Sequence, residues 1–94
     1  NIAGPEVEAA LLAHGDVVEC GVIGAADEER GQIVKAFVVL CQGVAADAET
    51  VKRLQDHVKA TIAPFKYPRS IEFIANLPKT QTGKIQRYRL KTET

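Results

Sequence analysis

Long hydrophobic runs are missing from this 94-residue chain, and cysteine is scarce. No apolar stretch approaches the length that spans a membrane, and no signal-peptide pattern opens the chain, so we expect no membrane partner. The two cysteines, Cys20 and Cys41, lie in β-like runs without C-x-x-C spacing. We interpret them as small buried residues of a reduced, cytoplasmic protein, and we expect no disulfide.

Residue patterns for common catalytic and metal chemistries are also missing. The two histidines, His14 and His57, have no cysteine, histidine or carboxylate at ligand spacing, so we predict no metal site. No Ser-His-Asp or Cys-His set and no carboxylate pair placed for acid–base work can be recognised. Neither G-x-x-x-x-G-K-[ST] nor G-x-G-x-x-G occurs. By itself, the chain is not expected to catalyse a reaction.

The residues that are present predict one small α+β domain. Hydrophobic periodicity and turn residues predict three helices and three strands. We expect helices between Gly4 and Gly15, from an Asp47 N-cap to Ile62 and over Gln86–Thr92, and strands over Val17–Gly24, Ile33–Cys41 and Ser70–Ala75. This order predicts a small three-stranded, mostly antiparallel sheet flanked by helices.

The strand patterns also predict which residues face the core. The second strand is apolar on both faces apart from Lys35, which predicts that it is central in the sheet. In the first strand, alternation predicts that Val18, Cys20 and Val22 share one face and that Glu19 and Gly21 lie on the other.

Charge is unevenly distributed although the net charge is zero. Residues 1–65 carry five basic and ten acidic side chains, whereas residues 66–94 carry seven basic and two acidic ones. Such segregation predicts an anionic ligand at the C-terminal end. Nucleic acid would meet the same description, but we do not expect it, because aromatic residues are few there and no RNP-like or helix-turn-helix pattern occurs.

The most distinctive stretch is Leu77–Arg89, which reads L-P-K-T-Q-T-G-K-I-Q-R-Y-R. A proline ends the preceding β-run, and the polar residues that follow predict a flexible turn around Thr80, Thr82 and Gly83. Lys84 leaves this turn with a long cationic side chain. Backbone donors, hydroxyls and one lysine suit phosphate binding, although a solvated surface turn has the same composition.

A second segment, Phe65–Arg69, places an aromatic ring beside two cations. Phe65 with Lys66 and Arg69 could stack on an adenine and pair with phosphates. Alternatively, Phe65 covers the core under the second helix while both cations are solvated.

Three motifs occur in order: N-I-A-G-P-E-V-E at the start, I-A-P-F-K-Y-P-R-S-I-E-F in the middle and P-K-T-Q-T-G-K-I-Q-R in the lysine segment. They resemble motifs in the C-terminal domain of the adenylate-forming enzymes, which include acyl- and aryl-CoA synthetases, luciferases and peptide-synthetase adenylation domains. By this resemblance, residues 1–94 form the mobile C-terminal domain of an AMP-forming CoA ligase. Lys84 matches the family's catalytic lysine, and Thr80, Thr82 and Gly83 would support its phosphate loop.

The resemblance implies a two-step reaction. A carboxylate and ATP first form an acyl adenylate with release of pyrophosphate, and the acyl group then passes to CoA. Lys84 would serve the first step; after the domain rotates, Phe65, Lys66 and Arg69 would contact CoA. The implied partner is a large N-terminal domain, which would bind ATP, the Mg²⁺ expected with it and the carboxylate.

The motif set is most similar to benzoate- and 2-aminobenzoate-CoA ligases, so an aromatic acid is the expected substrate. One departure is Gly4, where the family usually has proline. The alternatives are a fatty acyl-CoA synthetase or another adenylating enzyme of the family, and a stand-alone α+β module that binds a nucleotide or RNA.

Overall fold

The computed structural model describes residues 4–91. Their elements are α1 (Gly4–Leu12), β1 (Val17–Asp27), β2 (Gly31–Leu40), α2 (Ala48–Thr61), the 3-10 helix η1 (Pro64–Lys66), β3 (Ser70–Phe73) and α3 (Arg87–Lys91). All six predicted helices and strands are thus confirmed. The predicted helix end at Thr92 and the motif residues 1–3 lie outside the described residues. Within them, no helix has the length and apolar character that crossing a membrane requires.

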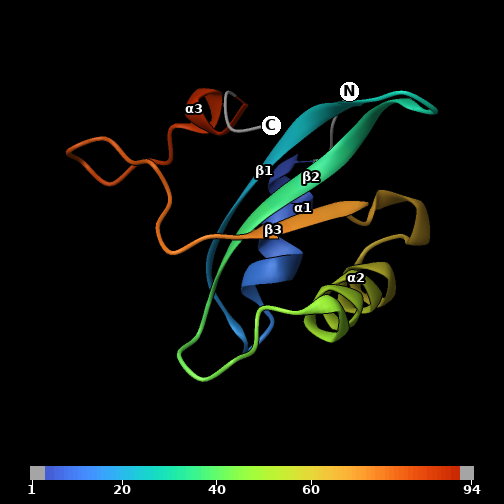
Figure 1. The fold of residues 1–94 in the computed structure, drawn as a ribbon, viewed down its shortest axis with the longest axis horizontal. Helices are drawn as coiled ribbons and strands as arrows, with labels where there is room; N and C mark the ends of the chain where they lie inside the picture. Colours follow the sequence, from blue (N-terminus) through green and yellow to red (C-terminus); the bar gives the residue numbers. More distant parts are fainter. Residues whose placement is uncertain (1–3, 92–94) are drawn as a thin grey trace.

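The sheet has the strand order β1-β2-β3, so β2 is central as predicted. β1 and β2 form a long antiparallel hairpin, whereas β3 pairs with β2 in parallel (Figure 1). The sheet is therefore mixed and mostly antiparallel. Because parallel strands need a crossover connection, the chain passes through α2 and η1 between β2 and β3.

The hairpin is longer than predicted at its turn. β1 continues to Asp27 and β2 begins at Gly31, so only residues 28–30 connect the strands. The Arg30 N–H donates to the Asp27 carboxylate at 2.9 Å, and Gly31 takes a positive φ of 80°. The predicted strand ended at Gly24, but Ala25 and Ala26, although alanine has low β-propensity, also pair with β2.

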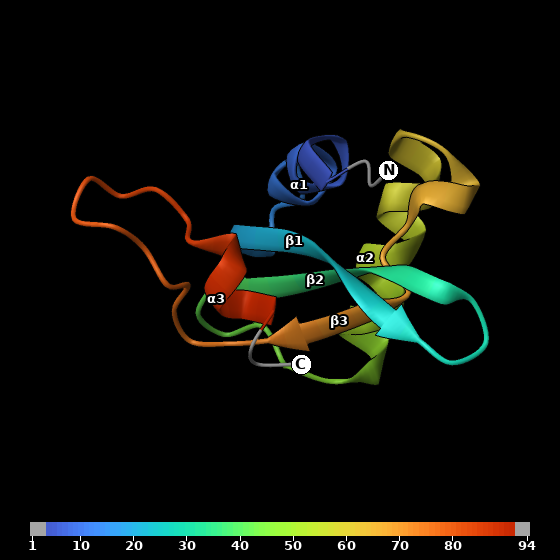
Figure 2. The same ribbon diagram turned by 90° about the horizontal axis from the view of Figure 1, so that it is seen from above.

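Two hydrophobic cores lie on the two faces of the sheet. Residues of α1 and α2 share one core, whereas Leu90 of α3 belongs to the other, and Figure 2 shows α3 in front of the strands and α2 behind them. The first core consists of Val7, Ala10, Leu11, Val17, Cys20, Val22, Ala36, Val38, Leu54 and Val58, and the second of Ile23, Phe37, Leu77 and Leu90. Central strand β2 contributes to both, with Ala36 and Val38 on one face and Phe37 on the other, which explains its apolar pattern.

The prediction that Val18 shares a face with Cys20 and Val22 is wrong. Its side chain is 55% exposed, whereas Val17 is buried in the first core. The register between β1 and β2 shifts between Val17 and Glu19, so an extra residue is accommodated there. Such a bulge breaks the alternation, and Val17 takes the inward position that Val18 would otherwise occupy.

Helix α2 begins as predicted at an Asp47 N-cap. The Asp47 carboxylate accepts the Thr50 N–H at 3.0 Å, which satisfies one free donor of the first turn. Leu54 and Val58 are fully buried against α1 and the sheet. The amphipathic pattern of this helix therefore holds the crossover onto the first core.

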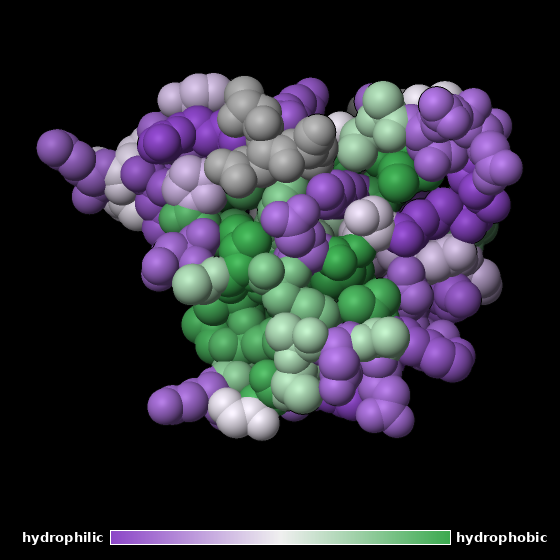
Figure 3. Space-filling model, viewed as in Figure 1, coloured by the Kyte–Doolittle hydropathy of each residue, from purple (hydrophilic) through white to green (hydrophobic). Residues whose placement is uncertain are grey.

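The α3 side of the sheet is only partly covered. Figure 3 shows hydrophobic side chains gathered in one area of this face, toward the connection between β2 and α2. Two shallow hollows there share Ile74 and Ala75; one is also lined by Val39 and Phe73, the other by Phe37. We call this area the open apolar face.

We expect Leu54→Ala to lower the free energy of unfolding by about 2–5 kcal/mol, because it leaves a cavity in the first core. The matched control is Leu12→Ala in α1, where the side chain is 50% exposed and the expected loss is within about 0.5 kcal/mol. Urea unfolding of the chain measures both. Equal losses would contradict the described packing of α2.

Candidate functional site

The lysine segment forms an ordered projection between β3 and α3. Figure 1 shows it extending away from the rest of the molecule. Its two legs are joined by backbone hydrogen bonds, from Gln86 N–H to Pro78 O at 2.8 Å and from Thr80 N–H to Lys84 O at 2.9 Å. We call residues 78–86 the lysine loop. The predicted polar turn is thus a narrow hairpin rather than a flexible connection.

The tip of the lysine loop is shaped by its own polar groups. Gly83 takes a φ of 89°, and its N–H donates to Thr80 O at 3.0 Å. The Thr80 hydroxyl accepts the Lys84 N–H at 3.1 Å and lies 3.0 Å from the Thr82 hydroxyl. Thr80, Thr82 and Gly83 therefore fix the turn that carries Lys84, and their contact with phosphate stays a prediction.

Lys84 is exposed, and within residues 4–91 it has no ion-pair partner. Its ammonium group is therefore available to an anion brought to the projecting end of the domain. Most other cations of the basic C-terminal part are engaged in contacts within the chain, which makes Lys84 the cation best placed to meet a ligand.

The legs of the lysine loop are fastened to the body at three points. Ile85 packs against the second core, beside Leu77 and Leu90. On the first leg, Lys79 pairs with Glu19 of β1. Directly after the second leg, Arg87, the first residue of α3, pairs with Glu8 of α1. The tip thus projects from a base that apolar contacts and two ion pairs hold.

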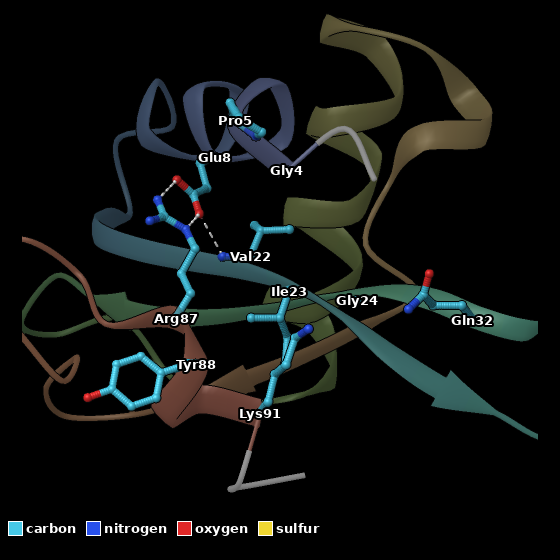
Figure 4. Close-up of a pocket in the computed structure, with 10 residues that line it drawn as sticks. All are labelled: Gly4, Pro5, Glu8, Val22, Ile23, Gly24, Gln32, Arg87, Tyr88 and Lys91. Carbon is cyan, nitrogen blue, oxygen red and sulfur yellow. Dashed lines mark hydrogen bonds and ion pairs between the residues drawn. The ribbon is translucent and has the colours of Figure 1, made fainter. Parts of the chain in front are cut away.

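The Glu8–Arg87 pair joins three elements (Figure 4). Arg87 donates through Nε to Glu8 Oε2 at 2.8 Å and through Nη2 to Oε1, and the Val22 N–H of β1 also donates to Oε2 at 2.8 Å. The hydrogen bond to Glu8 raises the pKa of Arg87 further above its usual value. The pair forms part of the wall of a groove of about 650 Å³ between α1, β1 and α3.

Sequence analysis missed Glu8 and Glu19 as partners of the lysine segment. Glu8 lies 79 residues from Arg87, and no spacing rule links positions so far apart. The only signal in the sequence was the excess of acidic residues in the first part of the chain and of basic residues in the last. We interpreted the basic end as a ligand site, but Lys66, Lys79 and Arg87 pair with acidic residues of α1 and β1.

The Phe65–Arg69 segment lies at the other end of the molecule from the lysine loop, as η1 and the loop show in Figure 1. The structure therefore does not bring the two predicted sets together. Phe65 is 76% exposed, so it does not cover the core. Lys66 pairs with Glu6 of α1 at 2.8 Å.

Tyr67 organises the remaining cations of this segment. The Nζ of Lys59 in α2 lies 4.3 Å from the centroid of its ring, and the Cζ of Arg69 lies 4.9 Å from it. Arg69 also donates to the Tyr67 hydroxyl at 2.7 Å. Lys59 was not predicted to belong to this site; α2 brings it to the segment from six residues upstream. An exposed ring and three cations thus share one end of the domain.

The described residues provide no metal site. Among residues 4–91, no group of three or more His, Cys, Asp or Glu side chains is placed to hold a metal ion. His14 and His57 instead contact each other edge to face at the α1–α2 interface, with ring centroids 4.9 Å apart.

Both cysteines are free, and Cys20 is buried as predicted, whereas Cys41 is only partly buried. The Cys20 thiol lies beneath α1 and contacts the backbone oxygen of Glu8 at 3.5 Å. Burial, and then the Glu8 charge, raise the pKa of this thiol from 9.0 to about 12. The folded state therefore binds the thiol proton more tightly than the unfolded state does.

Comparison with known proteins identifies the class of domain. Residues 6–84 match the profile of the AMP-binding enzyme C-terminal domain, a range that ends at Lys84. The chain belongs to this family.

The relatives are acyl-CoA synthetases. Human mitochondrial acyl-coenzyme A synthetase ACSM2A is 58% identical over 93 residues, which cover 97% of this chain and 16% of the relative. A solved acyl-CoA synthetase from Brucella canis has a TM-score of 0.93 at 46% identity, covering 98% of this chain and 17% of that one. A benzoate CoA ligase from Burkholderia xenovorans LB400 has a TM-score of 0.87 at 43% identity, over 95% and 18%. The chain thus spans 16–18% of the length of these proteins.

These comparisons confirm the resemblance to the C-terminal domain of adenylate-forming acyl-CoA synthetases, together with its α+β fold.

We expect Cys20 to resist a thiol reagent at pH 8 in the folded Cys41→Ala variant and to react after unfolding.

Because the folded state binds the Cys20 proton more tightly than the unfolded state, the raised pKa contributes to the stability of the fold. This contribution is complete below about pH 9 and is lost as the pH rises toward about 12. Urea unfolding across this range measures the loss, which should shrink in Cys20→Ala. Rapid labelling of the folded protein would contradict the described burial.

Proposed function

We propose that residues 1–94 are the mobile C-terminal domain of an ATP-dependent, AMP-forming carboxylate–CoA ligase whose substrate is an aromatic acid such as benzoate or 2-aminobenzoate. The observation that carries the proposal is the position of Lys84, exposed on an ordered projecting loop and without an ion-pair partner within residues 4–91. The similarity of the motifs to aryl-CoA ligases, and the similarity of the fold to a benzoate CoA ligase, support the aromatic substrate.

Lys84 suits the adenylation step because two anions must approach each other there. The carboxylate attacks the α-phosphate of ATP, the new C–O–P linkage forms and pyrophosphate leaves. A lysine that donates to both the carboxylate and the phosphate reduces their repulsion and stabilises the charge that develops. The fixed tip formed by Thr80 and Gly83 limits the movement of Lys84 and so favours this orientation.

The Phe65–Arg69 segment suits the second step, in which the CoA thiol attacks the acyl adenylate and AMP leaves. Exposed Phe65 can stack on the adenine of CoA, and Lys66 and Arg69 can pair with its phosphates. The segment and the lysine loop lie at opposite ends of the domain, which supports rotation of the whole domain between the two steps.

The remaining parts of such an enzyme would lie in a large N-terminal domain. The open apolar face supports a contact with this partner, since exposed apolar areas commonly mark interaction surfaces. The residues described here do not fit a Mg²⁺ site, so any Mg²⁺ that accompanies ATP would be held by the N-terminal domain.

A second candidate substrate is an aliphatic carboxylic acid. It is favoured by the similarity of the fold to a fatty acyl CoA synthetase from Mycobacterium tuberculosis, at 29% identity and a TM-score of 0.86. The acyl pocket that would decide between the two acids is expected in the N-terminal domain. The cytoplasmic location also stays a prediction, and the human relative of 58% identity is named as a mitochondrial protein.

We expect Lys84→Ala in the parent enzyme to lower carboxylate-dependent ATP–pyrophosphate exchange by roughly 10²–10³-fold. Formation of the thioester from a pre-made aroyl adenylate and CoA should be largely kept. The matched control is Lys52→Ala on α2, an exposed lysine paired with Asp56, which should leave both half-reactions unchanged. Survival of exchange in Lys84→Ala would make the loop an ordinary surface turn and would overturn the assignment.

We expect Lys66→Ala to raise the KM for CoA by roughly ten-fold, since one charge-assisted contact is lost, while exchange is unaffected. Glu6→Gln should act in the opposite direction and lower this KM by about two- to five-fold, because it releases Lys66 from an exposed ion pair. Steady-state kinetics with CoA as the varied substrate test both. An unchanged KM in both variants would place the CoA phosphates elsewhere.

A further inference from the structure

We propose that Arg87 and Glu8 are positioning residues for Lys84. In this proposal, which rests on the adenylation role of Lys84, their ion pair fixes the direction in which the lysine loop leaves the domain. Neither residue touches the reacting groups. Their effect on the reaction is through the orientation of the loop.

The contacts of Glu8 make it a rigid attachment point. Its carboxylate is only 12% exposed and accepts three hydrogen bonds, two from the Arg87 guanidinium and one from the Val22 backbone. Val22 lies in the middle of the β1–β2 hairpin, where Ala36 is its partner. Although the Arg87 side chain is 48% exposed, its bidentate contact with the largely buried Glu8 carboxylate restricts both angle and distance.

Arg87 is close enough to Lys84 along the chain to restrict the position of the lysine. Only Ile85 and Gln86 separate the two residues; Ile85 packs in the second core, and the Gln86 N–H is bound to Pro78 O. Beyond this base, the hydrogen bonds of residues 80–84 are made within the loop. The loop therefore follows the orientation of its base as one unit.

The other leg is held less firmly. Lys79 reaches Glu19 through one ammonium group, and both side chains are about one-third exposed. A lysine contact of this kind sets distance but not angle, whereas the Arg87 guanidinium meets Glu8 through two nitrogens. The Glu8–Arg87 pair is therefore the contact that determines the direction of the loop.

Removal of the pair should affect one half-reaction. A misplacement of about 1 Å in a positioned catalytic group can cost on the order of 10²-fold in rate. We expect Arg87→Ala to lower the rate of ATP–pyrophosphate exchange by roughly this factor, with little change in the KM for ATP. Thioester formation from the pre-made adenylate, which would not use the lysine loop, should be kept.

The test uses the full-length parent enzyme with Arg87→Ala, Glu8→Gln, Arg87→Lys and Lys84→Ala, each checked for folding by thermal unfolding. Arg87→Lys keeps the positive charge but cannot form the bidentate contact with Glu8. Its exchange rate should therefore lie between those of Arg87→Ala and the wild type. The matched control is Arg53→Ala, which removes an arginine–carboxylate pair with Asp16 far from the loop and should leave exchange unchanged.

A double variant separates positioning from general destabilisation. Added to Lys84→Ala, Arg87→Ala should cause no further loss of exchange, because it acts only through the lysine. An additional loss, an equal loss in both half-reactions or full exchange in Arg87→Ala would each overturn the positioning role. Exchange that survives Lys84→Ala itself would instead show that the underlying assignment of Lys84 is wrong.

Discussion

The burial of both faces of β2 is the constraint on which the rest of the domain depends. A strand of this kind must be central, and it requires cover on each side. α1 and α2 cover one face over Ala36 and Val38, and α3 covers the other over Phe37. Because α3 follows the lysine loop directly, the packing of a five-residue helix on this second face also decides where the loop returns to the body.

Local patterns were sufficient to predict the elements of this fold. Apolar periodicity located both long helices and the central strand, and Asp47 marked the start of α2. The bulge at Val17–Glu19 could not be predicted, because it depends on the register with β2. Lys84 was singled out from the sequence by its motif, and the structure shows that its side chain is exposed. Glu8 and Arg87 could not be linked in advance, since their contact exists only after α1, β1 and α3 have assembled.

Charge segregation along a chain has two physical explanations, and this domain combines them. Opposite charges in distant segments can attract each other during folding, or one sign can be kept for a ligand. Here, Lys66, Lys79 and Arg87 are matched with carboxylates of α1 and β1, so much of the basic excess serves the chain itself. The informative cation is Lys84, which has no ion-pair partner in the described residues and lies on the projecting loop.

Strand β3 separates the two predicted functional segments of the domain. Because β3 runs parallel to β2, η1 precedes it at one end and the lysine loop follows it at the other. Its four residues, at about 3.3 Å each, hold the two segments apart as a spacer of fixed length. An enzyme that used both segments at one reaction centre could not present them together. The two segments could then act only in separate events, because a single strand keeps them apart.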